Sequence, residues 1–122
     1  MTAAIPAARP SIGSLEIDAV AEVMATGNLA QGRQVSAFET EFASVVAGRD
    51  CVAVNSGTSA LHLALLAAGI GPGDEVIVPS FTFAATANAV SLTGATPVFA
   101  DIEHDSFCID PVSVEAALTP LT

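Results

Sequence analysis

From residue 51 onward, short apolar runs rich in β-branched residues alternate with segments of helical composition, and this alternation restricts the fold most strongly. The predicted strands are residues 51–54, 75–79 and 96–100, and the predicted helices between them are residues 59–68 and 82–92. Turns containing glycine or proline separate these segments. Helical connections between successive strands favour a mostly parallel sheet. We therefore predict an α/β fold in which helices flank the sheet.

The first 48 residues follow a different pattern, which predicts helices without strands. Apolar residues recur at helical spacing in residues 14–26, and Gly27 ends that segment. A short loop, residues 27–33, leads into a second helical pattern that stops at Gly48. Near the other end of the chain, Pro111 begins a last predicted helix that runs to residue 118.

The charge balance excludes several classes of partner. The net charge is −10, and the only basic side chains besides histidine are Arg9, Arg33 and Arg49. Because no basic cluster matches a phosphate backbone, we expect no nucleic-acid partner. No run of about 18 apolar residues and no signal-peptide core is found, so we expect no membrane partner and a cytoplasmic location.

The low charged fraction indicates that part of the surface is covered by a partner. Charged residues make up 13% of the chain, against about 25% in a typical soluble domain. The partner is the rest of a larger domain, a second subunit, or both. The chain also contains no lysine, so no Schiff base can form on one of its side chains.

The first candidate motif lies where a predicted strand meets a predicted helix. Gly57, Thr58 and Ser59 combine a glycine with two hydroxyl groups at that junction. Free backbone N–H groups and the positive end of the helix dipole bind anions there, and glycine lets a phosphate approach closely. The alternative is an ordinary helix cap, for which serine and threonine are favoured without any ligand. The dinucleotide and P-loop fingerprints are both absent.

The second candidate motif follows the next predicted strand. Residues 78–88 contain a small polar turn and two aromatic side chains, Phe81 and Phe83. Ligands of open α/β sheets bind beyond the carboxyl ends of the strands, so this turn and the first motif are expected to face one crevice. An aromatic ring there can stack on a flat cofactor. The alternative is that both phenylalanines belong to the core.

Four ordered motifs resemble one enzyme family. They are GTSALHLAL (57–65), GPGDEVIVP (71–79), FTFAATAN (81–88) and GATPVFAD (94–101). Together they resemble the DegT/StrS group of nucleotide-sugar aminotransferases, which are fold-type I enzymes dependent on pyridoxal 5'-phosphate (PLP). The similarity covers most of the chain from about residue 5. It implies that the chain is the N-terminal portion of the large domain of such an enzyme, and that the domain is incomplete.

The resemblance also implies roles for particular residues. Gly57, Thr58 and Ser59 match the turn that holds the cofactor phosphate, and Phe83 matches the aromatic residue that stacks on the pyridine ring. Phe81 is expected to pack behind Phe83. The loop 27–33 resembles a loop at the substrate end of the site, where Asn28 and Gln31 are expected to meet the sugar or its nucleotide. The family usually has proline at the position of Arg33 in this loop.

The catalytic residues implied by the resemblance are not in this chain. The Schiff-base lysine and the aspartate that pairs with the pyridine nitrogen are expected beyond Thr122. We therefore expect residues 1–48 to form a helical lead-in with the substrate-side loop. Residues 49–122 are expected to form the truncated first part of the PLP-binding domain. His62, on the predicted phosphate helix, is expected to be structural.

The activity implied by the family is transfer of an amino group from an amino acid to a keto group of a nucleotide-linked sugar, with glutamate as the expected donor. The family works as a homodimer with sites at the interface. Two alternatives to this activity remain open. In the first, the chain is a truncated or split remnant without activity. In the second, it is a regulator that binds PLP or sugar without catalysis.

Two further sets of reactive side chains, an acidic group with a histidine and a pair of cysteines, are assigned no function. Asp101, His104 and Asp105 lack a recognised ligand spacing, so no metal is predicted. Cys51 and Cys108 are far apart and also lack metal-site spacing. We expect both to be buried free thiols.

Overall fold

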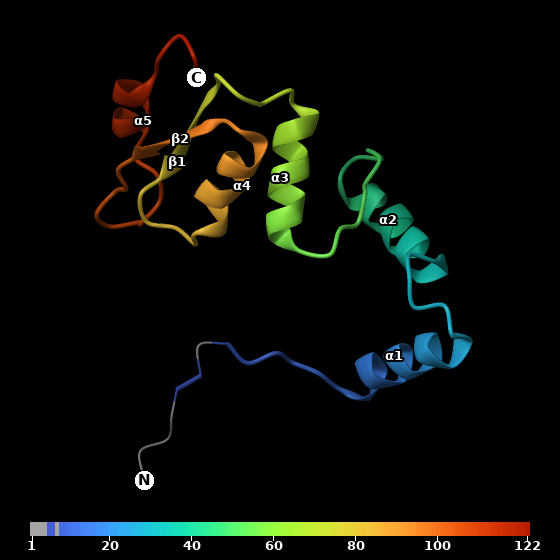
Figure 1. Cartoon of the computed structure of the whole chain (residues 1–122). Helices are drawn as coiled ribbons and strands as arrows, with labels where there is room; N and C mark the ends of the chain where they lie inside the picture. The colour runs from blue at the N-terminus through green and yellow to red at the C-terminus, as the bar shows by residue number, and fades with distance from the viewer. Residues whose placement is uncertain (1–4, 7) are drawn as a thin grey trace. The chain divides into compact units, whose positions relative to one another are not determined.

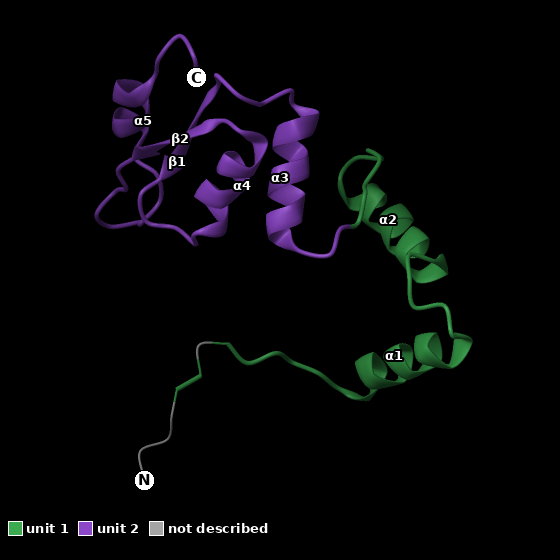
Figure 2. Ribbon diagram, in the orientation of Figure 1, with its two compact units in different colours: residues 1–53 green, residues 54–122 purple. Residues whose placement is uncertain are grey.

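The computed structural model describes residues 5, 6 and 8–122 and divides into two compact units. Unit 1 covers residues 1–53 and unit 2 covers residues 54–122 (Figure 2). Of the expected lead-in, residues 1–4 and 7 lie outside the described part of the chain.

Unit 1 contains two helices, α1 (Ser14–Thr26) and α2 (Arg33–Val45). At the start of α1, the Glu16 carboxylate accepts a hydrogen bond of 2.6 Å from the backbone N–H of Gly13. This bond to the backbone holds the pKa of Glu16 below its ordinary value. Gly27 ends α1 with a φ of 70°, a left-handed conformation that glycine adopts without strain.

Unit 2 is an α/β structure built on two parallel strands (Figure 1). Its elements in chain order are α3 (Gly57–Ala67), β1 (Glu75–Pro79), α4 (Ala85–Thr93), β2 (Thr96–Ala100) and α5 (Pro111–Ala117). The register pairs Glu75 with Thr96 and Pro79 with Ala100. Parallel strands need a connection that returns the chain to the same end of the sheet, and α4 is that connection. The predicted α/β class and parallel pairing are therefore confirmed.

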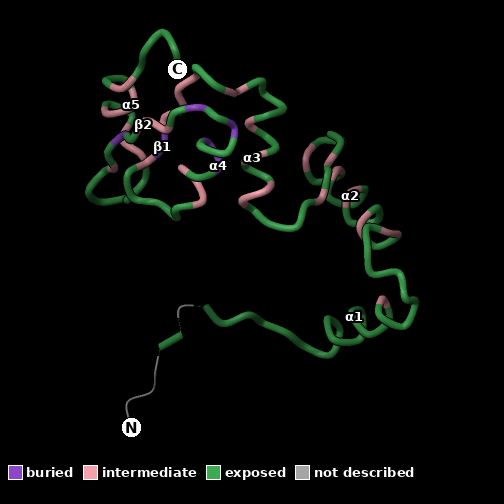
Figure 3. Tube along the Cα trace, in the orientation of Figure 1, coloured by how far each residue is buried: buried purple, intermediate pink, exposed green. Residues whose placement is uncertain are grey.

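The core of unit 2 lies between α4 and the sheet (Figure 3). Val78 of β1, Val90 of α4 and Ala95 form the buried cluster. Partly buried apolar side chains pack around it, namely Leu65, Ile70, Val76 and Ala87. Leu65 belongs to α3, so the cluster also connects α3 with the sheet through α4.

In the turn before β1, the ring of Pro72 lies close to the backbone of Gly94. Gly94 ends α4 with a φ of 86°, and a Cβ atom at this position would lie 2.9 Å from Cγ of Pro72. Both the left-handed conformation and this short distance require glycine. In the same turn, the Asp74 carboxylate accepts a hydrogen bond of 2.9 Å from the N–H of Gly71. The motif residues 71–79 and 94–101 thus meet in the structure.

The structure bears out most predicted elements and contradicts one. The bounds of α1, β1 and β2 agree with the sequence, while α4 begins at Ala85 instead of residue 82. The predicted strand at residues 51–54 is wrong for this structure, because the segment pairs with no strand among the described residues. Val52 is 79% exposed there.

Much apolar surface remains uncovered in both units. The buried apolar side chains are Val78, Ala89, Val90, Ala95 and Ala100. Large apolar side chains of α3, including Leu61, Leu63 and Leu66, are exposed on a helix that contacts α4 on one side. No helix in the described ranges is long and apolar enough to cross a membrane.

Shortening Val90 should destabilise unit 2 measurably. The Val90 side chain is 1% exposed, so Val90→Ala removes two buried methyl groups and leaves a small cavity. We expect the free energy of unfolding to fall by about 2 kcal/mol, measured by urea denaturation. Val112→Ala is the control, because Val112 is 72% exposed and its loss should cost less than about 0.5 kcal/mol. Equal effects of the two variants would contradict the assigned core.

Candidate functional site

The amino-terminal end of α3 offers unpaired backbone donors. Ser56 is the N-cap residue in an extended conformation, and its Oγ accepts a hydrogen bond of 3.1 Å from the N–H of Ser59. Its carbonyl oxygen accepts from the N–H of Ala60 at 3.0 Å. The N–H groups of Gly57 and Thr58 have no acceptor in the described part of the chain. These two donors lie at the positive end of the helix dipole, which is suited to an anion.

The hydroxyl of Ser59 already takes part in a local network. It donates to Oδ1 of Asn55 at 2.7 Å and accepts from Oγ of Ser56 at 3.0 Å. A ligand that used the Ser59 hydroxyl proton would have to displace Asn55. The Thr58 hydroxyl, in contrast, makes no hydrogen bond within residues 5, 6 and 8–122. Of the two predicted hydroxyl donors, Thr58 is therefore the more available.

Sequence reasoning placed Asn55 and Ser56 in this turn but assigned neither residue a role. Ser56 is the cap, and Asn55 orients the hydroxyl of Ser59. The signal was present, because a serine directly before a helical segment is a typical N-cap. The predicted helix began two residues too late, at residue 59, and this error hid the cap.

Gly57 leaves open space beside the turn. A Cβ atom added to Gly57 would meet no atom within 4 Å, and the residue does not have a positive φ. Neither backbone strain nor packing within the chain therefore requires glycine here. Open space next to free backbone N–H groups is what a tightly bound phosphate needs. The turn thus has room and free donors for a phosphate group.

The two phenylalanines of the second motif have different surroundings. Phe83 is 80% exposed, so its ring is free to stack on a flat ligand. Phe81 packs against Phe107, with ring centroids 5.9 Å apart. Both follow β1 in a turn that continues the sheet by one bond, from Ser80 N–H to the carbonyl of Ala100 at 2.8 Å. In Figure 1 this turn and the beginning of α3 lie at the same end of unit 2.

The two predicted substrate-side residues both belong to unit 1, but their side chains have different surroundings. Asn28 lines an open hollow of about 700 Å³ between α1 and α2. Gln31 does not line it, since its Nε2 donates to the carbonyl of Ala53 at 3.4 Å. Arg33 is the first residue of α2, a position for which proline is also well suited. Arginine at this family proline position is therefore compatible with the same helix start.

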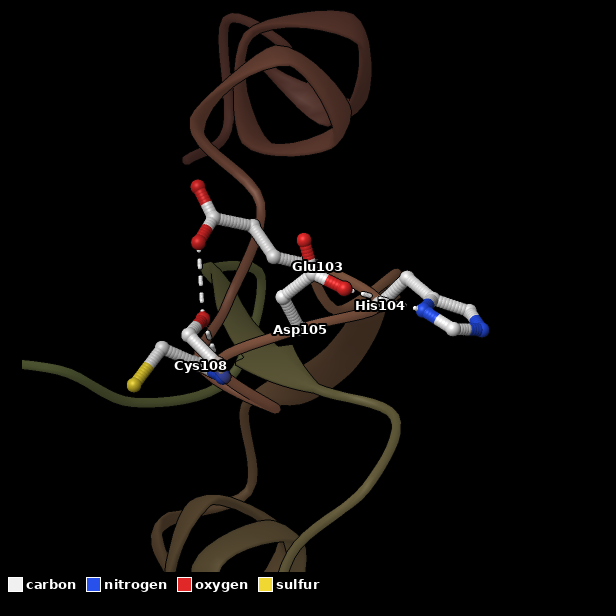
Figure 4. Close-up of polar contacts among 5 residues, drawn as sticks. Glu103, His104, Asp105 and Cys108 are labelled. Atoms are coloured by element: carbon white, nitrogen blue, oxygen red, sulfur yellow. Dashed lines mark hydrogen bonds and ion pairs between the residues drawn. The ribbon is translucent and has the colours of Figure 1, made fainter.

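The acidic loop after β2 is held by its own polar contacts (Figure 4). Ser106 donates to the Glu103 carboxylate at 2.7 Å, and His104 contacts Asp105 at 3.2 Å with both side chains fully exposed. In the described residues no group of three or more potential ligands is placed to hold a metal. Both cysteines are free, but the expectation that they are buried is wrong, because Cys108 is exposed and Cys51 is only partly buried.

Comparison with known proteins finds a matching family and close similarity to curated sequences. The model of the DegT/DnrJ/EryC1/StrS aminotransferase family matches residues 10–122. The spore coat polysaccharide biosynthesis protein SpsC of Bacillus subtilis (strain 168) is 54% identical over 118 residues. That alignment covers 97% of this chain and 30% of SpsC. The chain thus spans under a third of the length of this curated relative.

Solved structures agree in both sequence and fold. DesV from S. venezuelae, solved in complex with a ketimine intermediate, is 50% identical with a TM-score of 0.81. The match covers 88% of this chain and 29% of DesV. NtdA from Bacillus subtilis, solved with bound cofactor PMP, is 42% identical with a TM-score of 0.80, covering 87% of this chain and 24% of NtdA.

Removal of the Ser56 hydroxyl should weaken α3. In Ser56→Ala the N–H of Ser59 loses its side-chain acceptor. We expect the free energy of unfolding to fall by about 1 kcal/mol in urea denaturation, the usual cost of losing an N-cap. Ser11→Ala serves as the control, because Ser11 is exposed and its side chain has no hydrogen-bond partner among the described residues. Indistinguishable stabilities of the two variants would argue against the cap.

Proposed function

This chain belongs to the DegT/DnrJ/EryC1/StrS aminotransferase family, and we propose that it forms the cofactor-phosphate part of a PLP-dependent sugar aminotransferase. The observation that carries the proposal is the beginning of α3. There, the N–H groups of Gly57 and Thr58 have no acceptor among the described residues, and a Cβ atom at Gly57 would meet no atom within 4 Å. The proposal covers the complete protein, since this chain spans 30% of SpsC.

In this proposal, different residues of unit 2 hold the phosphate and the pyridine ring of the cofactor. The N–H groups of Gly57 and Thr58, with the Thr58 hydroxyl, bind the phosphate, and Ser59 supports the turn through Asn55. Phe83 places its exposed ring against the pyridine face. PLP when bound supplies an electron sink for the amino acid and sugar carbons. The binding of PMP by NtdA supports this choice of cofactor.

The substrates in this proposal are an amino acid, glutamate, and a nucleotide-linked sugar with a keto group. The role of SpsC in polysaccharide biosynthesis supports a sugar acceptor. Asn28, on the wall of the hollow in unit 1, is the stronger candidate for a substrate contact, because Gln31 already donates to Ala53. The complete protein is proposed to act as a cytoplasmic homodimer. Its partner subunit would cover part of the exposed apolar surface.

The chain by itself is proposed to be inactive. It contains no lysine, and the family chemistry needs one to bond with PLP and move a proton. A second candidate is a protein that binds PLP or sugar without catalysis.

An amino-transfer assay tests the activity directly. The complete protein with PLP, glutamate and a nucleotide-linked keto sugar should form 2-oxoglutarate and an aminosugar in equal amounts. Coupled detection of 2-oxoglutarate and mass spectrometry of the sugar measure the two products. The 122-residue chain under identical conditions should form neither. PLP binding by the complete protein without either product, across several keto sugars, would favour the non-catalytic binder.

Filling the space beside Gly57 should weaken phosphate binding selectively. Gly57→Val in the complete protein adds a side chain where no atom of this chain lies within 4 Å of the new Cβ. We expect the PLP dissociation constant to rise at least about tenfold, the size of one lost charged hydrogen bond. Binding of pyridoxal, which lacks the phosphate, should change little. Fluorescence titration measures both ligands.

Ala60→Val is the matched control, because Ala60 is exposed on the same helix. It should leave the affinity for PLP unchanged. Equal weakening of PLP and pyridoxal by Gly57→Val would contradict a phosphate site at this turn.

A further inference from the structure

The segment before α3 is held at Ala53 by two side chains, and it pairs with no strand in the described part of the chain. Oε1 of Glu39 accepts a hydrogen bond of 2.7 Å from the N–H of Ala53. Nε2 of Gln31 donates to the carbonyl of the same residue at 3.4 Å. Glu39 lies on α2 and Gln31 in the loop before it, so both contacts form within unit 1 (Figure 2). Both backbone groups of Ala53 thus have partners.

We propose that Glu39 is a positioning residue for the phosphate turn. From Ala53 the chain reaches Ser56, the cap of α3, in three residues, a reach of at most roughly 10 Å. Fixing the backbone at Ala53 therefore limits the motion of residues 54–56, the short segment that leads into the turn. Without this bond the N–H groups of Gly57 and Thr58 would be less preorganised for a ligand, which costs binding free energy. The link to cofactor binding rests on the function proposed above.

Three features distinguish the Glu39 contact from an incidental surface bond. It is short and partly buried, whereas most side-chain hydrogen bonds of this chain are exposed. Its acceptor is a carboxylate, and charged hydrogen bonds are about twice as strong as neutral ones. It joins residues 14 positions apart, so it depends on the tertiary fold.

Gln31 supports the same residue more weakly. Its distance of 3.4 Å to the carbonyl of Ala53 lies beyond the usual range for an N–H···O bond. The bond from Ala53 to Glu39 is therefore the stronger of the two contacts at this residue.

The experiment compares variants of Glu39 in the complete protein by two measurements. Hydrogen–deuterium exchange reports the protection of Ala53 and of residues 54–59, and fluorescence titration reports the dissociation constant of PLP. In Glu39→Ala, exchange should accelerate over the whole segment, and the PLP dissociation constant should rise about tenfold. Glu39→Gln keeps an amide oxygen as acceptor and should restore most of both properties.

Two more variants complete the set. Glu41→Ala is the matched control, because Glu41 is an exposed carboxylate on α2 whose side chain has no partner among the described residues. It should behave as the wild type. Glu39→Asp withdraws the carboxylate by one methylene and should resemble Glu39→Ala. This milder change decides the question if the alanine variant does not fold.

The outcomes separate the positioning role from the proposed function. Faster exchange at Ala53 alone, with residues 54–59 and PLP affinity unchanged, would overturn the positioning role. Wild-type behaviour of Glu39→Asp would overturn it too. If the wild type shows no saturable PLP binding, the proposed function fails instead. Exchange at residues 54–59 then decides the positioning role, because that measurement needs no cofactor.

Discussion

The parallel pairing of β1 with β2 is the constraint on which the rest of unit 2 depends. Because the strands run in the same direction, the chain must return across the sheet, and α4 makes this connection. The connection brings Val90 of α4 onto Val78 of β1 and forms the core. It also leaves the turn with Phe83 at the carboxyl end of β1, where ligands of α/β sheets bind.

The candidate phosphate turn is placed by a longer chain of contacts. α3 packs on α4, and α4 packs on the sheet, so the beginning of α3 is located through α4. Within the turn, Ser56 and Asn55 order the first residues of the helix. In the segment before it, Glu39 holds the backbone of Ala53. A Cβ atom at Gly57 would meet no atom within 4 Å, and the N–H groups of Gly57 and Thr58 have no acceptor in the described part of the chain.

The apolar surface agrees with the length of the chain relative to its family. Two paired strands and one small buried cluster are little for an independent domain. Large apolar side chains on α1, α2 and α3 remain exposed. The chain spans 30% of the length of SpsC. The low charged fraction of the sequence indicates the same property, because a surface meant for water carries more charge.

The sequence by itself determined the family, the α/β class and the bounds of α1, β1 and β2. These features rest on local signals, namely apolar spacing, glycine and proline positions, and short motifs. The cofactor roles of Gly57, Thr58, Ser59 and Phe83 stay predictions. What the structure adds is their surroundings, with free N–H groups at the turn and an exposed ring at Phe83.

Only the tertiary structure decided which polar groups already have a hydrogen-bond partner within the chain. In it, the Ser59 hydroxyl donates a hydrogen bond to Asn55, and the Gln31 side chain donates to the carbonyl of Ala53. Residues 51–54 have no strand partner among the described residues. A run of β-branched residues indicates an extended backbone, but strand pairing needs a second backbone at the right distance. The bond between Glu39 and Ala53 likewise joins residues that are distant in sequence, and no local pattern encodes such a contact.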